Sequence, residues 1–291
     1  MSNSKYSFWK LIDSYDIEIP MMQRDYAQGR KEDSITYVRS NIIASLESAL
    51  KFDTPLDFDF IYGRFKENEQ SNKKTTLIPI DGQQRLTTLF LLHWYLAIID
   101  RVDQTTMNVL GSFSYATRTS STEFCKKLVN HSCAISGDES ISETIKDSAW
   151  FIASWELDPT VASMLVMLDA IHAKFSHTHG LFAKLTDEDN PKITFQYTPM
   201  PQLGLTNDVY IKMNSRGRAL TEFENFKALF EQFLEKYHPT LKDNFAIKVD
   251  GSWTDFFWKH CKNDLIDEPF MNFFNFITKI LYSTFAHENY A

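Results

Sequence analysis

The residues with the clearest capacity for chemistry are five consecutive polar positions between two apolar segments, namely Asp81, Gly82, Gln83, Gln84 and Arg85. The apolar run before them predicts a short strand, and the run after them predicts a buried helix. A strand that becomes a helix through Gly82 leaves the first backbone N–H groups of the helix free, and such groups attract anions. Arg85 adds a planar cation suited to phosphate. This stretch therefore predicts a phosphate-binding turn.

A purely structural interpretation of the same turn is that Asp81 caps the helix and Arg85 pairs with a nearby carboxylate. Capping and ligand binding are compatible. Two adjacent amides, Gln83 and Gln84, are poorly explained by capping and favour contacts to a ligand or to a neighbouring loop. We therefore regard both residues as candidate binding groups.

Two further polar segments add candidates. A loop after a predicted strand carries Gln23, Arg24 and Tyr26. A second predicted strand–turn–helix carries Asn214, Arg216 and Gly217 ahead of a capping box, Thr221-x-x-Glu224, whose side chains satisfy N-terminal amides reciprocally. Gly217 permits a turn with positive φ, while Arg216 can reach an anion. These segments contain the positive charge that would complete a phosphate site.

Composition restricts the partners. The 291 residues carry a formal net charge of −8, which argues against a general polyanion-binding surface, so DNA contacts would have to be local or supplied by a partner. The three cysteines form no CxxC pair, which favours reduced thiols in the cytoplasm.

The longest apolar run, residues 86–99, is too short to span a bilayer, and we expect no membrane contact. His172, His177 and His179 lack the carboxylate or cysteine that would complete a metal site, so we expect none there.

The elements that position these residues follow from hydrophobic spacing. Helices are predicted at 5–15, 34–50, 86–99 and 148–182, and strands at 17–19, 58–62, 77–80, 193–197 and 209–213. The fold class is α+β. We expect a small mixed α/β core over residues 1–102 and a mainly helical region over residues 103–291, which returns residues 209–235 to the site.

Three motifs together resemble the GmrSD restriction endonuclease N-terminal domain family. They are Ile19-Pro-Met-Met-Gln-Arg-Asp-Tyr26, Asp81-Gly-Gln-Gln-Arg-Leu-Thr-Thr-Leu89 and Met213-Asn-Ser-Arg-Gly-Arg-Ala-Leu-Thr-Glu-Phe-Glu224. The resemblance implies a ParB/sulfiredoxin-like nucleotide-binding core in a phage-defence system. It also implies that a separate C-terminal or partner nuclease domain cuts DNA. The His-x-x-Pro signature usual in that nuclease domain is absent from this sequence.

We expect this chain to be a nucleotide-binding, NTP-hydrolysing module of a modification-dependent restriction system, with Mg²⁺ as a companion of the nucleotide. Gln84, Asp81 and Arg216 are the catalytic candidates. The phosphate-binding candidates are Gln23, Arg24, Tyr26, Asp81, Gly82, Gln83, Gln84, Arg85, Asn214, Arg216 and Gly217. Two alternatives stay open. One is a nucleotide- or DNA-sensing module without catalysis, and the other is a nuclease that uses a carboxylate set such as Asp57, Asp59 and Glu67.

Overall fold

The computed structural model describes residues 5–20, 25–66, 74–116, 118–131, 140–199, 222–259 and 266–289. The chain divides into two compact units, Met1–Gly204 and Leu205–Ala291. The first unit therefore extends well past residue 102, where the sequence suggested a boundary. Strands β5 and β6, both after residue 102, belong to the same sheet as the earlier strands.

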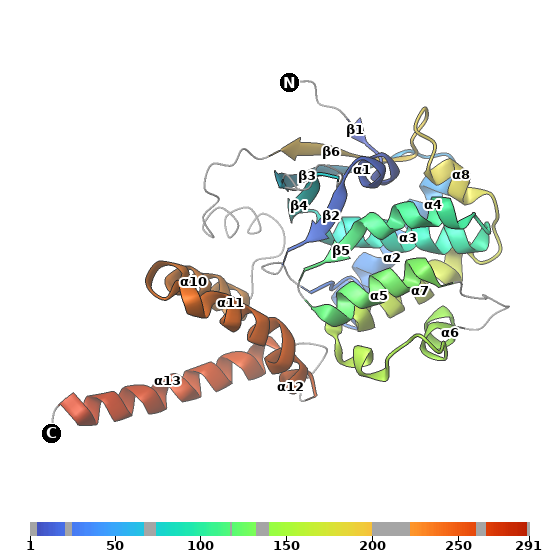
Figure 1. The fold of residues 1–291 in the computed structure, drawn as a ribbon. Coiled ribbons are helices and arrows are strands. Elements are labelled where there is room, and N and C mark those ends of the chain that lie inside the picture. Colours follow the sequence, from blue (N-terminus) through green and yellow to red (C-terminus); the bar gives the residue numbers. More distant parts are fainter. Residues whose placement is uncertain are drawn as a thin grey trace. The chain divides into compact units, whose positions relative to one another are not determined.

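The first unit contains one mixed sheet of six strands in the order β1-β6-β3-β4-β2-β5 (Figure 1). The strands are β1 (Lys5–Tyr6), β2 (Asp16–Ile19), β3 (Leu56–Lys66), β4 (Thr76–Asp81), β5 (Phe113–Tyr115) and β6 (Ile193–Pro199). β3 pairs antiparallel with β4 and parallel with β6, while β2 runs parallel to both β4 and β5. The strands predicted at 17–19, 58–62, 77–80 and 193–197 are all present.

Helices make up most of the rest of the same unit. They are α1 (Phe8–Ser14), α2 (Asp33–Lys51), α3 (Gln83–Ile99), α4 (Gln104–Val109), α5 (Thr119–Asn130), α6 (Ile141–Lys146), α7 (Pro159–Phe175) and α8 (Leu181–Leu185), with short 3₁₀ turns η1 (Leu110–Ser112) and η2 (Ala153–Leu157). α7 packs against α2, α3, α5 and α6 (Figure 1). The helix predicted over 5–15 is shorter, because its first residues form β1. The helical stretch predicted over 148–182 is interrupted between η2, α7 and α8.

The second unit is helical where it is described. Its elements are α10 (Glu222–Tyr237), α11 (Pro239–Lys248), a wide helical segment η3 (Val249–Trp253), α12 (Thr254–Trp258) and α13 (Asp267–Asn289). A small core of Phe223, Val249, Ile266 and Phe270 holds it together, with Phe223 and Phe270 stacked at 4.4 Å between ring centroids. The strand predicted at 209–213 and the capping threonine Thr221 lie outside the described residues. The α+β fold class is confirmed across the described chain.

α3 is the central helix of the first unit. Almost its whole length is buried, from Gln83 to Ala97 except for two positions in the first turn. This agrees with the prediction of a buried helix after the polar turn. No helix in the described part of the chain is long and apolar enough to cross a membrane.

His93, in the middle of α3, makes the stability of the fold depend on pH. Its Nδ1 donates to the carbonyl of Leu89 at 2.7 Å, and burial lowers its pKa to about 4. The unfolded chain, with a histidine pKa near 6.5, binds more protons between pH 6.5 and 4, so stability is lost as pH falls through that window. Between pH 7 and pH 5 we expect a loss of about 2 kcal/mol. Urea unfolding at both pH values measures this loss. The His93→Gln variant should lose less stability between the same pH values, and an equal loss in both proteins would contradict the assignment.

Candidate functional site

The turn between β4 and α3, residues 81–85 (here the Gly82 turn), requires glycine at its second position. Gly82 is the N-cap of α3 and has φ +94°, in the left-handed region. A Cβ at this position would lie 2.8 Å from Cγ1 of the buried Ile61 on β3. Both the conformation and the close approach of the neighbouring strand therefore exclude a side chain.

The helix start differs from the structural interpretation made from sequence. Asp81 does not cap α3; its Oδ1 accepts a hydrogen bond from the N–H of Gly82 at 2.8 Å. Gly82 occupies the cap position and offers no side-chain acceptor to the first turn of the helix. The N–H groups that open α3 are therefore left without a side-chain cap, and together with the helix dipole they form a positively polarised end.

Gln84 connects the Gly82 turn to a polar loop formed by residues 25–30 (the 25–30 loop). Its Oε1 accepts from the N–H of Ala27 at 2.8 Å, and its Nε2 donates to the carbonyl of Asp25 at 2.9 Å. Both ends of this amide are thus engaged by backbone. The sequence predicted that an amide here would contact a ligand or a neighbouring loop, and the structure shows the loop contact.

Gln83, in contrast, makes no such bond. Its side chain is buried, and its Oε1 has no hydrogen-bond partner among the residues that the structure describes. A buried amide oxygen without a donor costs about 1 to 3 kcal/mol. Of the two glutamines, Gln83 is therefore the one whose side-chain oxygen can accept a hydrogen bond from an additional donor.

Arg85 forms hydrogen bonds to strand β3 next to the turn. Its two terminal nitrogens donate to the backbone carbonyls of Phe58 and Phe60, the latter at 2.9 Å, and one of them lies 3.5 Å from Oδ2 of Asp81. β3 is irregular here, because its register with β6 shifts between Asp57 and Phe60. The guanidinium therefore bonds two carbonyls at this irregular part of β3, and the Arg85 side chain remains 24% exposed.

Tyr26 lies in the core rather than at an open surface. Its Oη is 2.7 Å from Thr88 Oγ1 on α3, and its N–H donates to Thr160 Oγ1 on α7 at 3.2 Å. Burial raises the pKa of this phenol well above its usual value, so the hydroxyl stays protonated. Tyr26 anchors the 25–30 loop between two helices, which places it behind the turn instead of in contact with solvent.

The opposite end of the 25–30 loop is held by Arg39 and by the main chain of α7. Nη1 of Arg39 donates to the carbonyls of Gln28 and Arg30 at 3.1 and 2.9 Å. Gly29 approaches α7 so closely that a Cβ there would fall 1.8 Å from the carbonyl oxygen of Ser163. The loop is therefore fixed along its length by α2, α3 and α7.

A buried charge network, not anticipated from sequence, supports the same loop. Arg118, just before α5, has a side chain that is only 5% exposed and lies 3.5 Å from both Asp25 Oδ1 and Asp158 Oδ1. Asp158 caps α7 by accepting from Thr160 N at 2.8 Å and also accepts from Ser121 Oγ at 2.6 Å. The capping role has a sequence signal, an aspartate directly before Pro159, but the pairing with Arg118 has none.

The structure thus gathers Tyr26, Asp81, Gly82, Gln83, Gln84 and Arg85 around one strand–helix junction. The remaining candidates, Gln23, Arg24, Asn214, Arg216 and Gly217, lie outside the described residues, and their approach to the turn stays a prediction. Among the described residues, no three histidine, cysteine or acidic side chains gather as a metal site would require. Asp57, a candidate for a nuclease site, forms an ion pair with Lys5 at 2.6 Å.

These features define an α+β domain with an uncapped helix start at a glycine turn, braced by a rigid polar loop. The chain belongs to the GmrSD restriction endonuclease N-terminal domain family, whose model matches it over residues 8–231. The family resemblance seen in the sequence is therefore confirmed. Membership makes this chain a module of a restriction and phage-defence system. No curated protein matches the chain.

Proposed function

We propose that the Gly82 turn binds the phosphates of a nucleoside triphosphate and that the domain hydrolyses it in the service of restriction. The observation that carries this proposal is the uncapped start of α3, where Gly82 removes any side chain between the first N–H groups and a ligand. Helix starts of this kind favour phosphate through their N–H groups and their dipole. The Arg85 guanidinium, fixed beside the turn by two carbonyls, adds positive potential without having to move.

The single carboxylate at the turn suits a magnesium–nucleotide complex better than a bare anion. Asp81 is 39% exposed beside the helix start, and its charge opposes free phosphate. Mg²⁺ is usually held by one or two carboxylates together with the phosphates of the nucleotide. Asp81 is the residue we assign to that ion, which would neutralise charge on the phosphates when bound.

An aromatic pair next to the turn supports a nucleotide over a simple anion. The rings of Phe60 and Tyr62 on β3 stack with centroids 6.0 Å apart, and Phe60 is 41% exposed. Tyr62 is the register partner of Asp81 across the β3–β4 pair, and the carbonyl of Phe60 accepts from Arg85. Bases stack on exposed aromatic side chains with little sequence preference, so this pair is a suitable platform for the base.

For hydrolysis, the arrangement favours Gln83 over Gln84 as the amide that orients water. Both amide atoms of Gln84 are bonded to the 25–30 loop, so its catalytic role predicted from sequence would require those bonds to break. Gln83 has a free acceptor one residue away. We assign it to the attacking water, and we keep Arg216, with Asn214 and Gly217, as the expected charge-stabilising contribution from the second turn. Gln23 and Arg24 are expected to close the pocket from the first motif.

Gln83→Leu is the variant that tests this function. Removing an unpaired buried acceptor should leave the melting temperature unchanged or raise it. Phosphate release from ATP, GTP, CTP or UTP with Mg²⁺ should nevertheless fall by at least about tenfold for the nucleotide that the wild type hydrolyses. Steady-state phosphate release and nucleotide binding by calorimetry measure the two effects. Unchanged release in the variant would remove Gln83 from the reaction.

The matched control is Gln84→Leu, the same change one residue later. It breaks two bonds to the 25–30 loop and should lower the melting temperature, because each such bond contributes about 1 kcal/mol. If the wild-type protein binds a nucleotide but releases no phosphate, the domain is a sensing module without catalysis. If it binds none of the four nucleotides, the proposal fails.

A further inference from the structure

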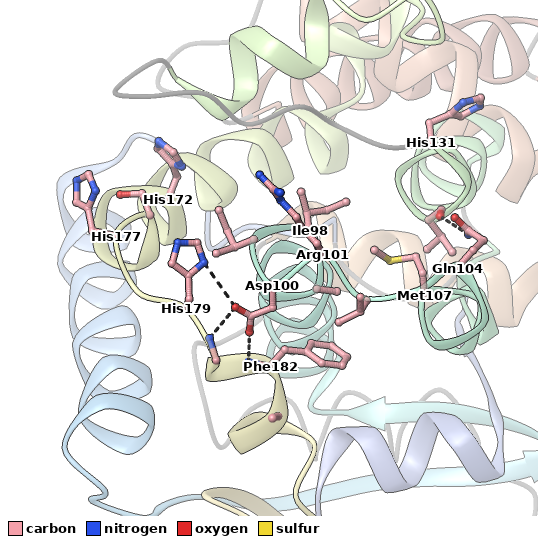
Figure 2. Close-up of a pocket in the computed structure, with 17 residues that line it drawn as sticks. Ile98, Asp100, Arg101, Gln104, Met107, His131, His172, His177, His179 and Phe182 are labelled. Carbon is pink, nitrogen blue, oxygen red and sulfur yellow. Dashed lines mark hydrogen bonds and ion pairs between the residues drawn. The ribbon is translucent and has the colours of Figure 1, made fainter.

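The far end of α3 borders a second hollow in the first unit. A cleft of about 1180 Å³ lies between the C-terminal end of α3, α4, the end of α5, the end of α7 and the start of α8 (Figure 2). One wall carries His172, His177 and His179, the other carries Gln104 and His131, and Arg101 lies between them in the view of Figure 2. The Gly82 turn is at the opposite end of the same helix, and its residues do not line this cleft.

Arg101 occupies a position that normally belongs to glycine. α3 ends in a Schellman motif, in which Val102 N donates to the carbonyl of Ala97 at 3.0 Å and Arg101 N donates to the carbonyl of Ile98 at 3.2 Å. Arg101 is the left-handed residue of this motif, with φ +52°. A non-glycine residue there is strained, and the packing of α3 gives no reason for an arginine. Its side chain makes no hydrogen bond or ion pair with the residues that the structure describes.

The one carboxylate in the cleft is already occupied. Asp100 accepts from the N–H groups of Gly180 and Phe182 at 2.7 and 2.8 Å, and its Oδ1 lies 3.8 Å from Nδ1 of His179. Its charge therefore serves the α7–α8 connection (Figure 2). The guanidinium of Arg101 remains as the permanent charge of the cleft that none of the described partners neutralises.

The histidines supply further donors. His172 Nδ1 lies 2.9 Å from Tyr95 Oη, and burial raises the pKa of that phenol, so the hydroxyl keeps its proton. When the phenol donates, neutral His172 carries its hydrogen on Nε2. Apolar side chains, Val102, Met107 and Phe182 among them, line the rest of the cleft. A cation, imidazole donors and an apolar surface thus occur together.

From this arrangement we infer that the cleft is a second binding site, for a small phosphomonoester with an apolar or planar body. Arg101 would bind the phosphate through its planar fork, imidazole N–H groups would donate to the remaining oxygens, and the apolar side chains would cover the organic part. A long polyanion suits the site less, because the chain as a whole carries a net charge of −8. This inference does not depend on the function proposed for the Gly82 turn.

The deciding variant is Arg101→Gly, because it removes the cation while placing the preferred residue in the left-handed position. We expect its melting temperature to equal or exceed that of the wild type. Its affinity for phenyl phosphate, measured by calorimetry on the full chain, should fall at least about tenfold, since the charged bidentate contact is lost. Lys126→Ala, which removes one exposed positive charge of α5 outside the cleft, should bind phenyl phosphate like the wild type.

A titration of the wild-type chain followed by the NMR resonances of its histidine rings locates the site without any variant. Phenyl phosphate should shift the rings of His172 and His177, and inorganic phosphate and phenol should bind more weakly than the combined probe. Equal affinity of Arg101→Gly and wild type would overturn the inference. So would a complete absence of binding, or binding that leaves the cleft histidines unshifted, which would place the ligand elsewhere.

Discussion

Gly29→Ala is expected to destabilise the first unit by about 3 kcal/mol or more and to lower its melting temperature by roughly 6 to 12 °C. The added Cβ would fall 1.8 Å from the carbonyl oxygen of Ser163 and 2.4 Å from its carbonyl carbon. Both are backbone atoms in the second turn of α7, so no side-chain rotation relieves the overlap. The 25–30 loop must move away from α7, or α7 must shift within the core that it shares with α2 and α3.

Calorimetric or circular-dichroism melting of the variant measures the effect, and Gly111→Ala is the matched control. A Cβ at Gly111 would have its nearest neighbour at 3.9 Å, an ordinary contact with Val129. We expect this change to alter stability by less than about 0.5 kcal/mol. A Gly29→Ala protein that melts as the wild type does would mean that the loop does not rest on α7 as described. Because the loop also carries Asp25 and Ala27, the variant should disturb the contacts of Gln84.

Asp158→Ala is expected to lower the free energy of unfolding by about 4 kcal/mol, which is the second large effect. The change removes the cap of α7, the acceptor for Ser121 and the carboxylate that lies 3.5 Å from the buried guanidinium of Arg118. Asp25 still lies 3.5 Å from Arg118 in the variant, but a buried guanidinium that loses one of its carboxylate partners costs more than the loss of an exposed pair. Urea unfolding at neutral pH measures the loss.

Asp103→Ala provides the comparison, because Asp103 also caps a helix by accepting from the backbone, at Thr106 N, but does so at the surface. Its loss should lower the free energy of unfolding far less than the loss of Asp158 does, because it leaves no buried charge behind. The double variant Asp158→Ala with Arg118→Met should be more stable than the sum of the two single losses predicts, since it leaves no unpaired charge on this pair. Strict additivity would contradict a coupled pair.

The elements with strong local patterns could be predicted from sequence. α2 and α3 follow from helical spacing. The strands around residues 58–62 and 193–197 follow from alternation, and the strand around residues 77–80 follows from its apolar run. The glycine turn was also predictable, because only a residue without a side chain connects a buried strand to a buried helix so abruptly. What local pattern cannot show is which turn the 25–30 loop meets, since Gln84 and Ala27 are 57 positions apart.

The roles of the polar residues were harder to predict than their positions. Arginine is a residue type that often binds phosphate, but Arg85 also donates hydrogen bonds to two carbonyls of an irregular strand. The register shift in β3 that makes the strand irregular has no sequence signal. Gln83 and Gln84 are identical in type, and only the fold distinguishes the bonded amide from the unbonded one. The cleft around Arg101 depends on a left-handed arginine, which a helix-propensity pattern does not reveal.

The position of β6 also determines when the sheet can be completed as the chain is synthesised. β6 lies between β1 and β3, although it follows β3 by more than a hundred residues. Until residue 199 leaves the ribosome, the eleven-residue strand β3 has a bare edge, and β1 has no partner. At usual elongation rates this interval lasts on the order of ten seconds, and exposed strand edges of nascent chains are sites of aggregation and of chaperone binding. The sheet order thus makes the nascent first unit dependent on protection of β3 until its last strand arrives.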